Sequence, residues 1–146
     1  MIIAIDFDGT LVSQERDYDD VTSPLLMLPG ALAALRAFKQ ADHTVLVYSA
    51  RANRALRLDP MLDPLVRAGH RKAADAQRWA RSKPLAEARY RHMVEFCTQK
   101  LKGLVDAVDD GGQGKPMADL FIDDRAVCYG PLSWAQIAQE YGEPSE

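Results

Sequence analysis

Short apolar runs, each bounded by polar residues, recur along the chain and limit what it can fold into. Residues 1–5, 44–48, 104–108 and 120–122 are such runs, and residues 127–129 form a weaker one. Segments with helical periodicity lie between them. Strands that alternate with helices predict parallel βαβ units in an open twisted sheet. We therefore expect an α/β fold, namely a three-layer, Rossmann-like open parallel sheet of about five strands with helices on both faces.

Helix starts are marked by capping residues or by proline at the first helical position. Pro29-Gly30 opens a helix that carries Leu32, Leu35 and Phe38 on one face. Further helices are predicted after Asp59-Pro60, after Asp63-Pro64, over residues 71–81, from Ser82 and Pro84 to about residue 102, and from the capping box of Ser133 and Gln136 to Gly142. Residues 11–28 and 109–114 are expected to be loops.

The chain has 146 residues, which predicts a single domain over residues 1–146. The connection after the second strand is unusually long, so residues 52–82 are interpreted as a basic helical insert. The net charge is −3, but residues 51–102 hold 13 of the 18 basic residues and only 5 of the 21 acidic ones. This stretch is either a solvated helical surface or a face that attracts a polyanion toward an acidic site.

Composition excludes several classes of protein. The hydrophobic fraction of 47% and the charged fraction of 27% are typical of a globular domain and not of a disordered or fibrous chain. Cys97 and Cys128 are too few for a zinc site or a disulfide framework, and we expect both to be reduced. No basic segment precedes residues 1–5, and the apolar residues 25–35 are too few to span a membrane. The sequence therefore predicts a cytoplasmic protein without a signal peptide.

Carboxylates follow two of the predicted strands. Asp6 and Asp8 follow the first strand within the sequence Asp-Phe-Asp-Gly-Thr, and Asp123 and Asp124 follow the fourth. Because the carboxyl ends of parallel strands meet at one edge of a sheet, these side chains are expected to lie close together. Carboxylates this close repel one another unless a cation lies between them, and oxygen-only donors favour Mg²⁺. One carboxylate can then act as a nucleophile and another as an acid or base.

A hydroxyl and an ammonium group are expected at the same edge. Ser49 follows the second strand, and Lys115 precedes the fourth. Together with the metal, these groups suit an anionic substrate such as a phosphate ester.

The order of these residues resembles that of the haloacid dehalogenase-like (HAD) hydrolase superfamily, over residues 1 to about 130. The sequence Asp-Phe-Asp-Gly-Thr-Leu-Val at residues 6–12 matches the first motif of that superfamily, and Ser49 matches the second. Lys115 matches the third motif, and Asp123-Asp124 matches the fourth. Residues 115–125 also resemble a small subgroup of nearly capless members. The chain departs from the family in having residues 52–82 in place of the usual cap domain.

The resemblance implies a role for each matching residue. Asp6 would attack phosphorus to form an aspartyl-phosphate, and Asp8 would protonate the leaving oxygen and then activate water. Lys115 would neutralise charge, and substrate phosphate would be bound by Thr10, Ser49, Ala50 and Arg51. The Mg²⁺ ligands would be Asp6, the Asp8 carbonyl and Asp123, with Asp124 beside them. The expected protein is thus a Mg²⁺-dependent phosphatase, and its basic insert favours a nucleotide or a nucleic-acid phosphate end as substrate.

Two other functions fit part of the pattern. Phosphorylatable receiver domains use similar residues, but their phosphorylated Asp lies at the third strand, whereas here the Asp-x-Asp-Gly-Thr motif lies at the first. A nucleic-acid-binding protein without turnover would use the basic segment for non-specific affinity. A P-loop in residues 109–116 is rejected, because Asp109 and Pro116 stand where that motif needs Gly and Ser or Thr.

Overall fold

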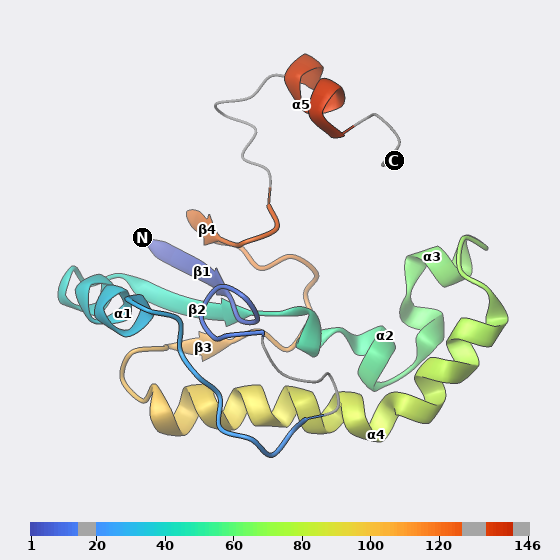
Figure 1. Ribbon diagram of the computed structural model, residues 1–146, viewed down its shortest axis with the longest axis horizontal. Helices are drawn as coiled ribbons and strands as arrows, with labels where there is room; N and C mark the ends of the chain where they lie inside the picture. The colour runs from blue at the N-terminus through green and yellow to red at the C-terminus, as the bar shows by residue number, and fades with distance from the viewer. Residues whose placement is uncertain (15–19, 127–133, 142–146) are drawn as a thin grey trace.

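The computed structural model describes residues 1–14, 20–126 and 134–141 (Figure 1). Within these residues, four strands form one parallel sheet in the order β3-β2-β1-β4. The strands are β1 (Ile2–Asp6), β2 (Thr44–Tyr48), β3 (Ala107–Val108) and β4 (Leu120–Ile122). The predicted α/β class with a parallel sheet is therefore confirmed. The expected strand at residues 127–129, with Cys128, lies outside the described residues.

The main hydrophobic core lies on one face of the sheet. Ile3 and Ile5 of β1 and Val45 and Val47 of β2 are buried there, because alternate residues of a strand point to the same face. Three helical segments cover this face. Helix α1 (Ala31–Gln40) contributes Leu35, and helix α4 (Ala73–Glu95) contributes Met93. The π-helical segment η3 (Phe96–Lys100), which continues α4, contributes Cys97. Leu35 therefore faces the core as predicted, whereas Leu32 is 36% exposed.

Helix α4 differs from the prediction of two helices that meet at Ser82 and Pro84. It runs without interruption from Ala73 to Glu95, and Pro84 lies inside it. Proline has a helix-compatible φ but lacks an N–H group, and an interior position costs about 3 kcal/mol. Packing offsets this cost, because α4 contacts η1, α2 and η2 of the insert and, near its end, packs against the sheet core through Met93.

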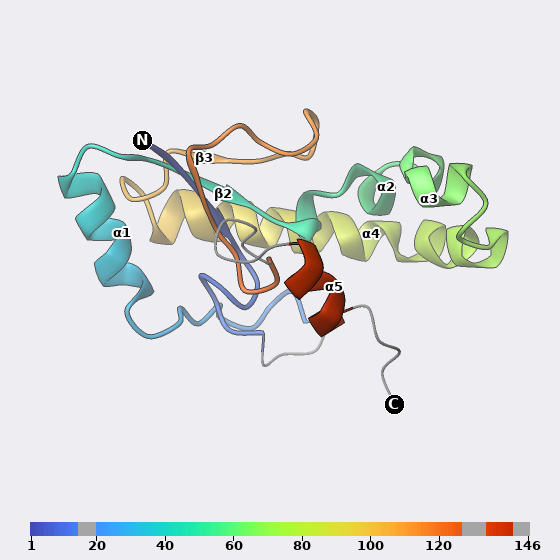
Figure 2. The ribbon, with the colours of Figure 1, turned by 90° about the horizontal axis from the view of Figure 1, so that it is seen from above.

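The insert after β2 is built from short helical segments beside the first half of α4, as Figure 2 shows. They are η1 (Ala50–Ala52), α2 (Arg54–Arg57), η2 (Pro60–Leu62) and α3 (Pro64–Arg67). The two Asp-Pro signals are confirmed, since the Asp59 side chain accepts a hydrogen bond from the Met61 N–H and the Asp63 side chain accepts one from the Leu65 N–H. These caps fix the turns of the insert.

Strand β3 is shorter than residues 104–108, which were predicted to form it. The N–H groups of Leu104 and Val105 donate to the Leu101 carbonyl in a turn, so only Ala107 and Val108 remain to pair with β2. The last helix, α5 (Trp134–Tyr141), starts where predicted, although its capping residue Ser133 and Gly142 lie outside the described residues. No helix in the described part of the chain is long and apolar enough to cross a membrane.

Candidate active site

Three carboxylates from two neighbouring strands converge at the carboxyl edge of the sheet. Asp6 ends β1, and Asp123 and Asp124 follow β4, which pairs directly with β1. One carboxylate oxygen from each residue lies within 4.8 Å of the others. We call Asp6, Asp123 and Asp124 the acid cluster. The structure thus brings together three of the four carboxylates that the sequence predicted at this edge.

The loop after β1 is shaped to admit Asp124. Gly9 has a φ of 81°, and a Cβ atom at this position would lie 2.7 Å from Asp124 Oδ2, so a side chain would clash. The Thr10 hydroxyl accepts a hydrogen bond from the Asp124 N–H at 3.1 Å. The same hydroxyl lies 3.3 Å from Asp6 Oδ2 and 3.3 Å from Asp124 Oδ1. Thr10 was predicted to bind phosphate, and in the structure its hydroxyl links Asp6 to Asp124.

The members of the acid cluster differ in how they hold a proton. Burial, together with the negative charge of Asp123, raises the pKa of Asp6 to about 6. A hydrogen bond from the Tyr48 hydroxyl and one from the Arg125 N–H hold the pKa of Asp123 below its ordinary value. The Tyr48 hydroxyl donates to Asp123 Oδ2 at 2.6 Å. Asp6 therefore binds a proton more readily than an ordinary carboxyl group does, whereas Asp123 is held as an anion.

This donor set suits a hard divalent cation. All candidate ligand atoms are carboxylate oxygens, and their separation allows one ion to contact all three side chains. A cation would also offset the burial and the repulsion that together raise the pKa of Asp6. The fourth predicted ligand, the Asp8 carbonyl, accepts a hydrogen bond of 2.8 Å from Gln14 Nε2.

The Asp8 side chain points to a different partner. Its two oxygens accept hydrogen bonds of 2.7 Å from Nε and Nη2 of Arg51. Arg51 also donates to the Arg89 carbonyl and stacks over the Phe7 ring, with 5.1 Å from Cζ to the ring centroid. The Arg51 side chain is only 4% exposed. Arg51 was predicted to bind phosphate, and the structure places its guanidinium against Asp8 instead of toward solvent.

The remaining predicted residues line a cavity next to the acid cluster. Ser49 Oγ accepts a hydrogen bond from the Arg51 N–H and caps η1, which contains Ala50. Lys115 lies across the cavity, with its ammonium 4.2 Å from the centroid of the Phe121 ring. Ser49, Ala50 and Lys115 all line this cavity of about 500 Å³. The structure therefore gathers them around one space, although the Lys115 ammonium points to an aromatic ring.

The sequence indicated no role for Tyr48 or Gln14, and it placed Arg57 only among the insert arginines that would guide a polyanion. Tyr48 was part of a strand, yet it is the register partner of Asp6 and so its hydroxyl reaches the acid cluster. A polar-tipped aromatic residue at the carboxyl end of a strand is the signal that could have indicated it. Gln14 donates to the Asp8 carbonyl six residues before it, and Arg57 donates to the Asp110 carbonyl 53 residues after it; neither contact has a signal in the neighbouring sequence.

Several arginines of the insert form ion pairs with acidic residues of the same chain. Arg54 lies 3.6 Å from Asp110, Arg57 lies 3.3 Å from Glu87, and Arg71 lies 2.9 Å from Asp63. Arg78, in contrast, is exposed on α4. Part of the positive charge in residues 51–102 is thus balanced inside the fold, which weakens its attraction for a polyanion.

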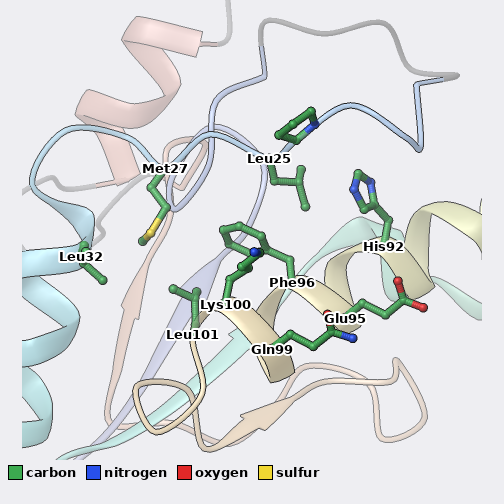
Figure 3. Close-up of a pocket in the computed structure, with 10 residues that line it drawn as sticks. Leu25, Met27, Leu32, His92, Glu95, Phe96, Gln99, Lys100 and Leu101 are labelled. Atoms are coloured by element: carbon green, nitrogen blue, oxygen red, sulfur yellow. The ribbon is translucent and has the colours of Figure 1, made fainter.

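A second cavity, of about 370 Å³, lies away from the acid cluster. Figure 3 shows it between the segment that carries Leu25 and Met27 and the helical surface of Phe96 and Leu101. Its lining is mostly apolar and includes no member of the acid cluster. The cavity beside Tyr48 and Ser49, and a smaller hollow of about 80 Å³ lined by Asp8, Ala50 and Arg51, therefore adjoin the candidate catalytic residues.

Comparison of the chain with protein-family models, with curated proteins and with solved structures found no match. The geometry of the described residues is consequently what bears on function.

Proposed function

We propose that the protein is a Mg²⁺-dependent phosphomonoester hydrolase that acts through an aspartyl-phosphate on Asp6. The observation that carries this proposal is the convergence of Asp6, Asp123 and Asp124 within 4.8 Å at the carboxyl edge of a parallel sheet. The resemblance of residues 6–12 to the first HAD motif supports it. A cytoplasmic location and a three-layer, Rossmann-like sheet of about five strands belong to the same proposal.

Asp6 is the proposed nucleophile. One of its carboxylate oxygens forms a bond to phosphorus while the bond from phosphorus to the leaving oxygen breaks. Asp8 gives a proton to that leaving oxygen. In the second half of the reaction Asp8 takes a proton from water, the water oxygen attacks phosphorus, and inorganic phosphate leaves with Asp6 regenerated. The hydrogen bonds from Arg51 fix the orientation of the Asp8 carboxylate and use one lone pair of each oxygen, which leaves a second lone pair on each oxygen for the transferred proton.

Asp6, Asp123 and Asp124 are the residues that would hold Mg²⁺. The ion, when bound, supplies positive charge that neutralises the phosphoryl oxygens and the carboxylates. Lys115 and Ser49 lie at the adjoining cavity, where an ammonium and a hydroxyl can bind further phosphoryl oxygens. Phosphoryl transfer depends mainly on such positioning and charge neutralisation, which is why this set of residues suits it.

The test is phosphate release from an aryl phosphate and from acetyl phosphate with Mg²⁺ and with a chelator. We expect turnover with Mg²⁺, none in the chelator, and none in Asp6→Asn, which keeps the side-chain shape but removes the nucleophile. Asp42→Asn is the matched control, because Asp42 is an exposed turn residue with a φ of 57° that asparagine also adopts.

Two results would count against the hydrolase. Turnover that survives Asp6→Asn would contradict the covalent mechanism. A phosphorylated wild-type protein that accumulates without releasing phosphate would instead indicate a phosphorylatable regulatory domain.

A further inference from the structure

The cavity beside the acid cluster has two walls from different parts of the chain. One wall comes from the insert and includes Arg54 and Leu62, and the other comes from residues 109–116. Its volume of about 500 Å³ is within the range of small-molecule sites, which is roughly 300–1,000 Å³. We call this space the insert pocket. The insert pocket is open to solvent on one side, and it offers a substrate a hollow beside this edge of the sheet.

The insert pocket begins one strand away from Asp6. Tyr48 lines it and is the register partner of Asp6, and its hydroxyl is hydrogen-bonded to Asp123 of the acid cluster. Ser49 and Lys115 line it as well. A phosphate group at Asp6 therefore has the insert pocket as its neighbour, and the rest of the substrate can extend into it.

The two walls are held together by close contacts, so the pocket exists before a ligand binds. Gly111 has a φ of 72°, and a Cβ atom there would lie 2.3 Å from the Ala52 carbonyl oxygen. Arg57 is buried and donates to the Asp110 carbonyl at 2.9 Å. Its guanidinium also stacks on the Tyr90 ring at 3.8 Å. Preformed walls of this kind reduce the entropy that a ligand loses on binding.

The lining combines an apolar side with a polar edge. Leu62, Ala55 and Pro116 contribute apolar surface, whereas the polar edge consists of Ser49, Asn53, Arg54, Asp109 and Lys115. A carboxylate accepts hydrogen bonds from hydroxyl groups, while a guanidinium or an ammonium donates to them. These polar groups can therefore bind several hydroxyl groups at once, and the apolar side chains can pack against the C–H face of a ring.

We infer that the insert pocket binds the leaving group of the substrate, and that this leaving group is a sugar ring, either free or part of a nucleoside. The inference rests on the proposed function, because it places the phosphate of the same molecule at Asp6. A polymeric substrate is disfavoured, since Arg54, which lines the pocket, and Arg57, which lies beside it, are paired with Asp110 and Glu87.

Binding can be measured without turnover in the Asp6→Asn protein with Mg²⁺ by isothermal titration calorimetry. The probes are inorganic phosphate, ribose 5-phosphate, adenosine 5′-monophosphate and a 5′-phosphorylated oligonucleotide. We expect both small sugar phosphates to bind about tenfold more tightly than inorganic phosphate, a gain of one decade for the contacts of the ring. Equal affinity for the two would indicate that the sugar ring alone is recognised, and tighter binding of the nucleotide would indicate a nucleoside.

Leu62→Trp in the same background fills the insert pocket and should remove the advantage of the sugar phosphates over inorganic phosphate. Leu65→Trp is the matched control, because Leu65 is 44% exposed on α3 and does not line the pocket. The inference is overturned if sugar phosphates bind no more tightly than inorganic phosphate. It is also overturned if Leu62→Trp has no more effect than Leu65→Trp, or if the oligonucleotide binds far more tightly than the mononucleotide.

Acetyl phosphate separates this inference from the proposed function, because its acetate leaving group needs no ring pocket. Hydrolysis of acetyl phosphate by the unmodified protein, without selective binding of sugar phosphates, would overturn the inference and leave the hydrolase standing. Selective binding that Leu62→Trp removes, in a protein that hydrolyses neither acetyl phosphate nor sugar phosphates, would support the pocket and contradict the hydrolase.

Discussion

Arg51 and Asp8 form a bidentate ion pair, with distances of 2.7 Å from Nε to Oδ2 and 2.7 Å from Nη2 to Oδ1. The two residues are 43 positions apart, and the Arg51 side chain is 4% exposed. A guanidinium in this geometry fixes both the position and the rotation of a carboxylate. Arg51 is therefore a positioning residue for the proposed acid and base, and it also joins the insert to the loop after β1.

Replacement of Arg51 should lower the turnover number more than it changes KM. In Arg51→Met the Asp8 carboxylate loses its fixed orientation, and we expect kcat to fall by about 100-fold, within the range for general acid–base catalysis. Arg51→Lys should recover part of the loss, since one ammonium replaces the charge but not the paired geometry. Steady-state kinetics with an aryl phosphate, whose leaving oxygen takes up a proton, measure both constants. Arg36→Met, on the exposed side of α1, is the control, and an unchanged kcat in Arg51→Met would contradict the assignment.

Asp6 should make the metal-free protein less stable as the pH rises. Its pKa is about 6 in the folded chain and 3.8 in the reference state, so the folded state binds the proton more tightly. Stability therefore falls as the pH rises from 3.8 to about 6, and the loss persists above that range. In a chelator near pH 7, Asp6→Asn should raise Tm by about 3 °C or more, and the difference should shrink near pH 4.

Thermal unfolding followed by circular dichroism checks this prediction at both pH values. Added Mg²⁺ should raise Tm of the wild-type protein more than that of Asp6→Asn, because the ion binds only the folded state. If Asp6→Asn is less stable than the wild type at neutral pH without metal, burial and neighbouring charges do not destabilise the Asp6 carboxylate.

The Tyr48 hydroxyl should affect metal affinity through Asp123. Tyr48→Phe removes the 2.6 Å hydrogen bond to Asp123 Oδ2 but keeps the ring that packs edge-on against Phe121. Partners of metal ligands typically contribute about 10-fold to 100-fold to affinity, so we expect the Mg²⁺ dissociation constant to rise by at least about tenfold. Titration calorimetry measures it directly. Unchanged Mg²⁺ affinity would mean that Asp123 does not depend on Tyr48 for its position.

Arg57 should be more important for stability than the other arginines of the insert. Its buried guanidinium lies 3.3 Å from Glu87, donates to the Asp110 carbonyl and stacks on Tyr90. Arg57→Met should lower the free energy of unfolding by about 2 kcal/mol, as is typical when a hydrogen bond from a charged group is removed. Urea denaturation measures the change, with Arg67→Met on the exposed surface of α3 as control. Equal stability of the two variants would contradict a linking role for Arg57.

Strand positions and helix caps could be predicted from the sequence because they depend on neighbouring residues. The apolar run at residues 44–48 coincides with β2, and the Asp59 and Asp63 caps lie where the Asp-Pro signals indicated. Helix α4 was mispredicted at Pro84, because the cost of an interior proline is local but the packing that offsets it is not. For the same reason β3 is short, since a turn around Leu101 takes up N–H groups that an apolar run alone would assign to a strand.

The sequence by itself determined which carboxylates could meet. Asp6 and Asp123 each follow an apolar strand, and parallel strands bring their carboxyl ends to one edge whatever the details of packing. Only the tertiary structure decided what these groups do to one another. Tyr48 reaches Asp123 across 75 residues, and Arg51 reaches Asp8 across 43. Such pairings depend on strand order, side-chain rotamers and burial, which arise from the whole fold and leave no pattern in the local sequence.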